Sequence, residues 1–251
     1  MEERGRLDRG DGVELAWIRH AGREPMVVFL PGFQSEMAGE KGTHLARFCA
    51  RSRIAMLRLD YSGHGASGGC FAEGSIGQWT ADALAVIDRQ AAGRLVLVGS
   101  SMGGWIALLI ARLRPERIAG LLGIAAAPDF TETLMWQAMT PAEQARLLAE
   151  GSLTAPSAYG EPILITSRLI EDGRRHLLLG APIPISCPVR LLHGQRDPDV
   201  PWETALRVAE RITGGDVRVT LIKDGEHRLS RPQDLALLSS TLAGLLGEDG
   251  F

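Results

Sequence analysis

Short apolar runs alternate with helix-patterned segments along most of this chain, and this alternation is the strongest constraint on its fold. The apolar runs predict six buried strands, at residues 26–30, 54–59, 94–98, 118–125, 189–192 and 217–222. Apolar residues three or four apart predict helices between them, at residues 37–50, 76–90, 102–113, 202–212 and 232–246. The alternating pattern of residues 13–19 predicts an antiparallel edge strand or hairpin. Together these elements are typical of an α/β fold, here a mostly parallel twisted sheet flanked by helices.

Composition excludes several classes of function. Of 251 residues, 45% are hydrophobic and 23% charged, and the net charge of −3 gives no basic surplus to attract nucleic acid or an anionic membrane. The cysteines at 49, 70 and 187 have neither disulfide nor zinc spacing. We find no secretory signal and no apolar run near the ~20 residues of a transmembrane helix. We therefore expect a cytoplasmic protein with no metal, no transmembrane segment and no nucleic-acid partner, and the oligomeric state stays open.

One segment interrupts the alternation of strands and helices. Residues 129–186 contain two helical stretches, near 131–150 and 162–172, and no predicted strand. We expect a small helical lid here, inserted into a core made of residues 1–128 and 187–251. Because ligands bind at the carboxyl ends of the strands in such sheets, the insertion would cover the ligand face. Four of its apolar side chains either line an acyl pocket or pack the insertion onto the core: Leu134, Met135, Trp136 and Met139.

The nucleophile is predicted from a Gly-x-Ser-x-Gly motif. Residues 99–103 (GSSMG) match it and lie between a predicted buried strand and a predicted helix, which is the setting of a nucleophile elbow. The glycines leave room for a sharp turn that lifts the central serine above the sheet. Centring the motif on Ser100 would need glycine at positions 98 and 102, which hold Val98 and Met102. The motif therefore predicts Ser101 as the nucleophile.

The serine needs a base and an acid, which follow it in the order Ser, acid, His in such folds. His193 and His227 both follow Ser101 and a predicted strand, and His227 is preferred because it leaves room for an acid before it. Asp197, four residues past the turn at His193, is the predicted acid. Asp199 is the near alternative and Asp129 the distant one.

Backbone N–H groups are expected to stabilise the oxyanion. One belongs to Met102, the residue after the nucleophile, and the other to the loop after the first buried strand, most simply Phe33. Loss of one such donor typically costs ~100- to 1,000-fold in rate.

Further motifs resemble the α/β-hydrolase superfamily over nearly the whole chain. Residues 60–67 (DYSGHGAS) resemble its loop after the second core strand, and residues 193–201 (HGQRDPDVP) resemble its acid loop, which supports Asp197 over Asp199. A closer similarity, to the α/β-hydrolase-domain protein ten family, is carried by residues 99–105 (GSSMGGW), 181–194 (APIPISCPVRLLHG), 200–202 (VPW) and 227–228 (HR). Animal members of that family are mitochondrial palmitoyl-protein thioesterases that also cleave acyl glucuronides. The resemblance implies the α/β-hydrolase fold, with Ser101, Asp197 and His227 as the catalytic triad, although this chain shows no evident presequence.

These observations lead to one main functional hypothesis and two alternatives. The main one is a serine hydrolase that cleaves carboxylic esters or thioesters of a small molecule or an acylated protein through an acyl-enzyme, without a cofactor. S-palmitoyl thioesters and acyl glucuronides are candidate substrates. One alternative is hydrolysis of another bond on the same scaffold, by a carbon–carbon bond hydrolase or a peptidase, since fold does not fix substrate. The other is a non-catalytic binding protein.

Overall fold

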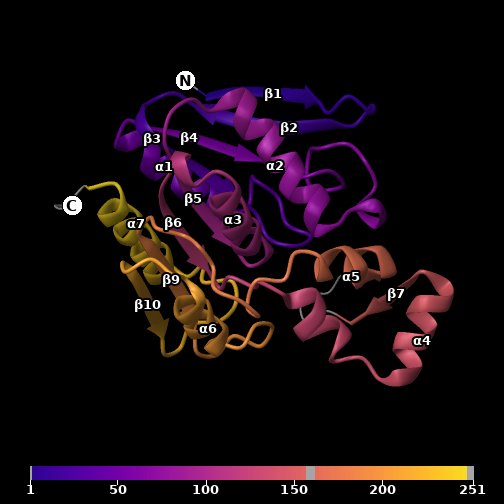
Figure 1. Cartoon of the computed structure of the whole chain (residues 1–251). Helices are drawn as coiled ribbons and strands as arrows, with labels where there is room; N and C mark the ends of the chain where they lie inside the picture. The colour runs from indigo at the N-terminus through magenta and orange to yellow at the C-terminus, as the bar shows by residue number, and fades with distance from the viewer. Residues whose placement is uncertain (1, 157–161, 248–251) are drawn as a thin grey trace.

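A twisted sheet runs through the part of the chain that the computed structural model describes, residues 2–156 and 162–247 (Figure 1). Within these residues it has eight strands, in the order β1-β2-β4-β3-β5-β6-β9-β10. Strands from β4 to β10 in this order are parallel, whereas β1 and β2 form an antiparallel hairpin and β2 is antiparallel to β4. The strands are β1 (Glu2–Asp8), β2 (Glu14–His20), β3 (Arg23–Leu30), β4 (Ile54–Leu59), β5 (Leu95–Ser100), β6 (Ile118–Ile124), β9 (Val189–Gly194) and β10 (Val217–Ile222).

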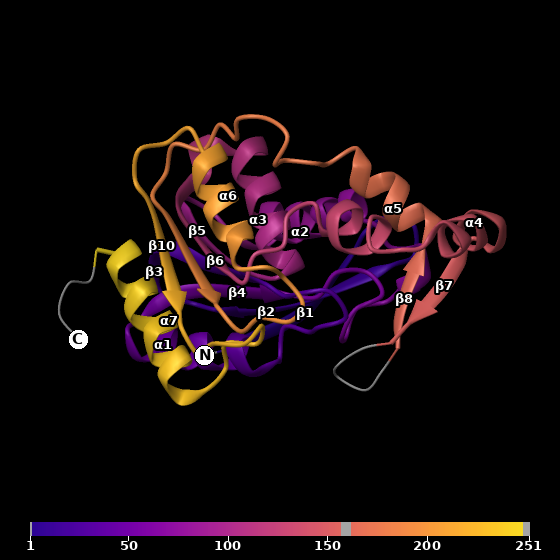
Figure 2. The same ribbon diagram turned by 90° about the horizontal axis from the view of Figure 1, so that it is seen from below.

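Helices cover both faces of this sheet. In Figure 2, α2, α3 and α6 lie on one face, and α1 and α7 lie on the other. The central strands are apolar on both sides: in β3, Val28 and Leu30 pack with the α2–α3 side, and Val27 and Phe29 pack with the α1–α7 side. Successive strand residues point to opposite faces, so a continuous apolar run fits a strand buried on both. The helices are α1 (Glu40–Arg51), α2 (Ile76–Gln90), α3 (Met102–Leu113), α6 (Glu203–Arg211) and α7 (Pro232–Leu245), with short 3-10 turns η1 (Phe71–Glu73) and η2 (Pro115–Arg117).

The predicted α/β fold is confirmed, and the six predicted strands lie where the apolar runs indicated, although β10, at the edge of the sheet, is only partly buried. The antiparallel strand predicted at residues 13–19 is present as β2, but it lies inside the sheet, and its hairpin partner β1, which forms the edge, was not predicted. Its sequence is almost entirely polar and its side chains are mostly exposed, so it carries no hydrophobic pattern to detect. Within the described ranges, no helix is both long and apolar enough to cross a membrane.

The insertion between β6 and β9 contains two strands, so the expectation of a purely helical segment was wrong. It runs through a π-helical turn η3 (Thr131–Trp136), α4 (Pro141–Glu150), the antiparallel pair β7 (Ser152–Ala155) and β8 (Ile163–Thr166), and α5 (Ser167–Arg174). The two strands have four residues each, too few for a clear pattern. The predicted second helix begins late because Thr166 caps it, its hydroxyl accepting from the Leu169 N–H at 3.1 Å. Residues 157–161 of the predicted insertion lie outside the described residues.

Asp129 joins the two ends of the insertion. Its buried carboxylate accepts hydrogen bonds from the N–H groups of Leu178 and Leu179, at 2.8 and 2.9 Å. We expect Asp129→Asn to lower the free energy of unfolding by about 1–3 kcal/mol, because an amide offers one acceptor oxygen and leaves a buried N–H unpaired. Denaturant unfolding measures this, with Asp88→Asn as a control for a surface ion pair of Arg117, expected to cost less than about 1 kcal/mol. Equal losses in both variants would contradict the role given to Asp129.

Candidate active site

Ser101 lies on the turn between β5 and α3 in a backbone conformation that side-chain-bearing residues rarely adopt. Its φ is 53° and its ψ is −119°. Hydrogen bonds hold this turn on both sides: the Ser101 N–H donates to the Ile124 carbonyl at 2.9 Å, and its carbonyl accepts from Gly104 and Ala127 at 2.9 and 3.1 Å. Strained backbone of this kind is maintained where the surroundings over-determine it, often at functional sites.

The tight turn requires a glycine at position 103. A Cβ there would lie 2.0 Å from the carbonyl oxygen of Leu30, a backbone atom that cannot move cheaply. We expect Gly103→Ala to destabilise the fold by about 1–3 kcal/mol through overpacking and to reduce activity by displacing the turn. Thermal unfolding and ester turnover measure these effects. The matched control is Gly244→Ala, since Gly244 is also helical and nothing lies within 4 Å of its added Cβ; a similar loss there would show that the turn is not special.

Hydrogen bonds link Ser101 to His227 and His227 to Asp197. The Ser101 Oγ is 3.1 Å from His227 Nε2, and His227 Nδ1 is 2.8 Å from Asp197 Oδ2. The loops after β10 and β9 supply His227 and Asp197 at the carboxyl edge of the sheet. Because a carboxylate only accepts, His227 Nδ1 carries the proton and Nε2 is left to accept from the serine hydroxyl. The arrangement suits transfer of the serine proton to His227 during nucleophilic attack.

The Asp197 carboxylate is buried but stays charged. Burial by itself raises its pKa, but hydrogen bonds from His193 and His227, the nearby His227 ring and the Val200 N–H lower it, and the pKa lies well below its usual range. The N–H groups of Asp199 and Val200 each donate to Oδ1 at 2.9 Å. An anion held this firmly can orient the imidazole and stabilise its cation.

The three residues left as alternatives take no part in the hydrogen-bonded path from Ser101 through His227 to Asp197. His193 contacts Asp197 from the side away from Ser101, with a fully buried ring. Asp129 is engaged by the insertion, as described above. Asp199 is exposed, and its carboxylate lies within 4.8 Å of ligand atoms of Asp197 and His227. A cation held by these three groups would compete with the bond between His227 and Asp197.

The loop after β3 lies directly against Ser101. A Cβ on Gly32 would lie 3.3 Å from the Ser101 Cβ and 4.0 Å from its Oγ. The next residue, Phe33, inserts its ring among Phe71, Phe130 and Trp79, with centroids 5.0 to 5.8 Å away. Met102, the other predicted donor, directly follows Ser101 and begins α3. Both predicted oxyanion residues thus come from segments adjoining Ser101.

Three residues that support this site were not predicted. Asp60 accepts from the Met37 N–H at 2.6 Å, and the Tyr61 hydroxyl donates to the Pro31 carbonyl at 3.1 Å, so the loop after β4 fixes the loop after β3. The Lys41 ammonium donates to the Arg228 carbonyl, next to His227. Asp60 and Tyr61 belong to the DYSGHGAS motif, which was a signal for them, but no pattern marked Lys41.

The four candidate pocket residues pack mainly within the insertion. Met135, Trp136 and Met139 contact a small hydrophobic cluster of the insertion, and Leu134 and Met135 contact the main core. The Arg174 guanidinium also covers the Trp136 ring, 4.6 Å from its centroid. Packing therefore accounts for these side chains, and their role in an acyl pocket stays a prediction.

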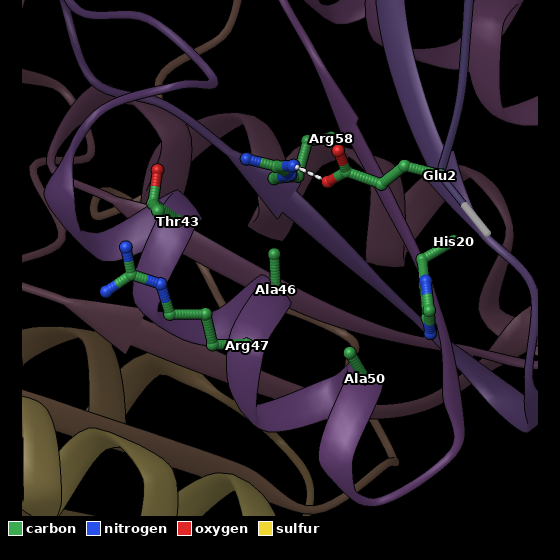
Figure 3. Close-up of a pocket in the computed structure, with 7 residues that line it drawn as sticks. All are labelled: Glu2, His20, Thr43, Ala46, Arg47, Ala50 and Arg58. Atoms are coloured by element: carbon green, nitrogen blue, oxygen red, sulfur yellow. Dashed lines mark hydrogen bonds and ion pairs between the residues drawn. The ribbon is translucent and has the colours of Figure 1, made fainter.

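Two cavities bear differently on this site. One of about 490 Å³ is lined by the loop after β3 (Gln34, Ser35, Glu36), by His64 and by Leu164 of β8, so it lies between the loop that carries Phe33 and the insertion. The other, of about 390 Å³, lies over α1 near Ala46 and Ala50. Figure 3 shows Glu2 and Arg58 pointing toward one another there, joined by an ion pair. The second cavity includes no predicted site residue, so it has no part in the chemistry that follows.

A parallel sheet of this order, with a strained serine between a central strand and the next helix, defines an α/β-hydrolase. The sequence profile of the family described as "Serine aminopeptidase, S33" matches residues 23–168. Among curated proteins, the mouse palmitoyl-protein thioesterase ABHD10, mitochondrial, is 41% identical over 242 residues, covering 96% of this chain and 81% of the relative. The human ABHD10 is 39% identical over 243 residues, covering 96% and 79%.

Solved structures agree with these sequence comparisons. The α/β-hydrolase domain-containing protein 10 from mouse superposes with a TM-score of 0.91 at 39% identity, covering 99% of this chain and 100% of that one. A hydrolase from Agrobacterium vitis S4 superposes with a TM-score of 0.94 at 37% identity, covering 98% and 99%. The chain therefore belongs to the α/β-hydrolase family of the S33 type, on the branch that includes ABHD10, and it is a hydrolase. The family resemblance seen in the sequence is confirmed.

The cytoplasmic location expected from the sequence is contradicted by these relatives. Those from mouse and human are both named as mitochondrial proteins. The expectation rested on scattered cysteines and a polar beginning of the chain. Cysteine spacing reports on thiol chemistry and does not distinguish one reducing compartment from another, so it could not decide the location.

Proposed function

We propose that this protein is a serine hydrolase that cleaves thioesters or carboxylic esters through an acyl-enzyme, with Ser101, His227 and Asp197 as its catalytic triad. The observation that carries the proposal is the unbroken path from the Ser101 Oγ to His227, at 3.1 Å, and from His227 to the buried Asp197 carboxylate, at 2.8 Å. Such a path is what activates a hydroxyl that is otherwise a weak nucleophile at neutral pH.

In the acylation step, each residue of the triad and each backbone donor has one role. His227 Nε2 takes the proton as the Ser101 Oγ attacks the carbonyl carbon, and Asp197 stabilises the imidazolium that forms. The backbone N–H groups of Phe33 and Met102 hold the developing oxyanion, with the start of α3 adding its positive dipole end. The imidazolium then protonates the departing thiol or alcohol as the carbon–sulfur or carbon–oxygen bond breaks.

Deacylation repeats these steps with water. His227 removes a proton from the water molecule that attacks the acyl carbon, the same two N–H groups hold the second oxyanion, and the Ser101 oxygen leaves with the proton from His227. The products are a free carboxylic acid and an unmodified serine. No described step needs a metal or an organic cofactor.

The substrate class is proposed from the relatives. The curated relatives are named palmitoyl-protein thioesterases, which favours a fatty acyl thioester over a short ester. We further propose that residues 129–186 form a lid over the acyl group, with Leu134, Met135, Trp136 and Met139 next to it. Contacts with the core support a fixed docking of this insertion: the Gly77 N–H donates to Asp172 at 2.7 Å and the Trp105 indole donates to the His176 carbonyl at 3.1 Å.

A comparison of substrates that share one acyl group tests this proposal. We would measure kcat/KM for an aryl ester, an S-acyl thioester and an acyl glucuronide, and then lengthen the acyl chain from two to sixteen carbons. The proposal expects the thioester series to be cleaved with a preference for long chains. Turnover of short aryl esters alone would leave the serine chemistry in place and remove the fatty acyl assignment.

One alternative has a specific observation behind it. The matched family profile is described as a serine aminopeptidase, so an aminoacyl anilide belongs in the same assay. An aminopeptidase must bind a free amine, which calls for an acidic group near the scissile bond. Preferred cleavage of the anilide would replace the ester hydrolase proposal with a peptidase.

A further inference from the structure

The carboxylate of Asp197 lies between two imidazole rings. His227 approaches Oδ2 from the side of Ser101, with its side chain 15% exposed, and His193 approaches the same oxygen from inside the protein, at 3.1 Å and with no exposure. His193 is part of β9, four residues before Asp197, and its Nε2 also lies 3.0 Å from the carbonyl oxygen of Val200. One ring therefore contacts both ends of the loop that carries the acid.

The surroundings of His193 determine which of its nitrogens carries the proton. Nε2 faces two oxygens that only accept, so it must donate. Nδ1 is buried without a hydrogen-bond partner among the described residues. A second proton there would leave an unpaired donor and an added charge inside the protein, which is costly. The Nε2–H of His193 is thus the donor that faces both oxygens.

We propose that His193 is a positioning residue for the acid of the active site, a role that rests on the triad proposed above. By donating to Oδ2 and to the Val200 carbonyl, its ring sets the rotation of the carboxylate and keeps Oδ2 aimed at His227, while Oδ1 stays with the N–H groups of Asp199 and Val200. It contacts neither substrate nor reacting atoms. An apolar side chain would fill the same core position but would leave both acceptors without this donor.

The His193 donor also weakens the pull of Asp197 on the His227 proton. Other charged groups lie close by: the exposed Asp199 carboxylate is within 4.8 Å of ligand atoms of this pair, Arg228 follows His227 in the chain, and the Lys41 ammonium donates to the Arg228 carbonyl. Without the donor, Oδ2 has a fuller negative charge facing His227, which favours the protonated imidazole. A base that stays protonated to higher pH moves the acid limb of kcat/KM to higher pH. The carboxylate is also freer to rotate, which lowers the rate.

Three substitutions of His193 distinguish the loss of its hydrogen-bond donor from a change in side-chain volume. His193→Gln restores the donor, because the amide nitrogen of glutamine is as many bonds from Cβ as the imidazole Nε2. His193→Asn places the amide at the position of Nδ1, which has no partner, and His193→Leu removes the donor. We expect kcat/KM to fall about 10- to 100-fold in the Asn and Leu variants, as for other outer partners of a site ligand. Their acid limb is expected to rise by about half a pH unit or more. The Gln variant is expected to stay close to the unmodified protein in both measurements.

Labelling with a fluorophosphonate separates the two proposals. If Ser101 is labelled but the Gln, Asn and Leu variants share the pH profile of the unmodified protein, the positioning role is overturned and the triad stands. Equal losses in the Gln and Asn variants, with no shift of the acid limb, would also overturn it, since bulk packing would then explain them. Should the Leu variant not fold, the Gln and Asn pair still decides. No labelling of Ser101 in the unmodified protein would overturn both proposals.

Discussion

Replacing Ser101 by alanine is expected to lower kcat for an ester or thioester by about 10⁴- to 10⁶-fold. Without the Oγ there is no covalent nucleophile, and only the binding site and oxyanion donors act on a water molecule. The remainder of the site should be undisturbed, because the hydroxyl contributes no packing and its hydrogen bond to His227 is made at a partly open edge. Steady-state kinetics with an aryl ester measure the loss.

The matched control lies one position earlier in the chain. Ser100 ends β5 and is 7% exposed. The serine hydroxyl that lies within hydrogen-bonding distance of His227 is that of Ser101. Ser100→Ala should therefore retain activity within a few-fold of the unmodified protein. Comparable activity in the Ser101→Ala variant, or a larger loss at Ser100, would contradict the choice between these neighbouring serines.

Replacing Asp197 by asparagine is expected to lower kcat by about 10⁴-fold, the second largest effect. The amide has one acceptor oxygen in place of two, while four donors converge on this group, from His193, His227, Asp199 and Val200. An NH₂ turned toward His227 would also impose the wrong tautomer on the imidazole. Because hydrogen bonds hold the Asp197 pKa well below its usual range, its protonation does not contribute to the loss of activity on mild acidification.

Asp199→Asn provides the control for that prediction. Asp199 carries the same side chain on the same loop but is exposed, and its backbone N–H, which the substitution keeps, already serves Asp197. We expect a change of less than about tenfold, since the substitution removes one exposed charge near the site and keeps the shape of the side chain. A loss at Asp199 that equals or exceeds the loss at Asp197 would reverse the assignment of the acid.

The strongly patterned parts of the chain could be predicted from sequence. Residues 54–59 and 217–222 form strands at the predicted bounds. The first is fully buried, as a nearly continuous apolar run predicts, and the second alternates between half-buried and exposed residues at the edge of the sheet. The Gly-x-Ser-x-Gly motif located its turn because few residues other than glycine fit there. A motif whose residue types are required by the backbone geometry can be recognised from the sequence alone.

The features that could not be predicted from the sequence have weak local patterns or depend on contacts between distant segments. The side chains of the edge strand β1 are mostly exposed, so its sequence is polar and shows no hydrophobic pattern. The strands β7 and β8 have four residues each, which is too few to show an alternation of apolar and polar residues. His193 was considered only as a base, since its place behind Asp197 depends on the path of the loop from residue 194 to 200. Lys41 reaches the Arg228 carbonyl across 187 residues of sequence, a distance that no local pattern spans.

Ser101 is expected to become acylated during turnover, and mass spectrometry of the trapped enzyme detects the acyl group. The protein is mixed with a slowly hydrolysed aryl ester, quenched in acid and digested, and the peptide containing residues 99–105 is sequenced. We expect one acyl group on Ser101, absent from the Ser101→Ala variant and accumulating in a burst before steady turnover. Steady turnover with the acyl group on another residue, or with no covalent adduct while the Ser101→Ala variant stays active, would contradict it.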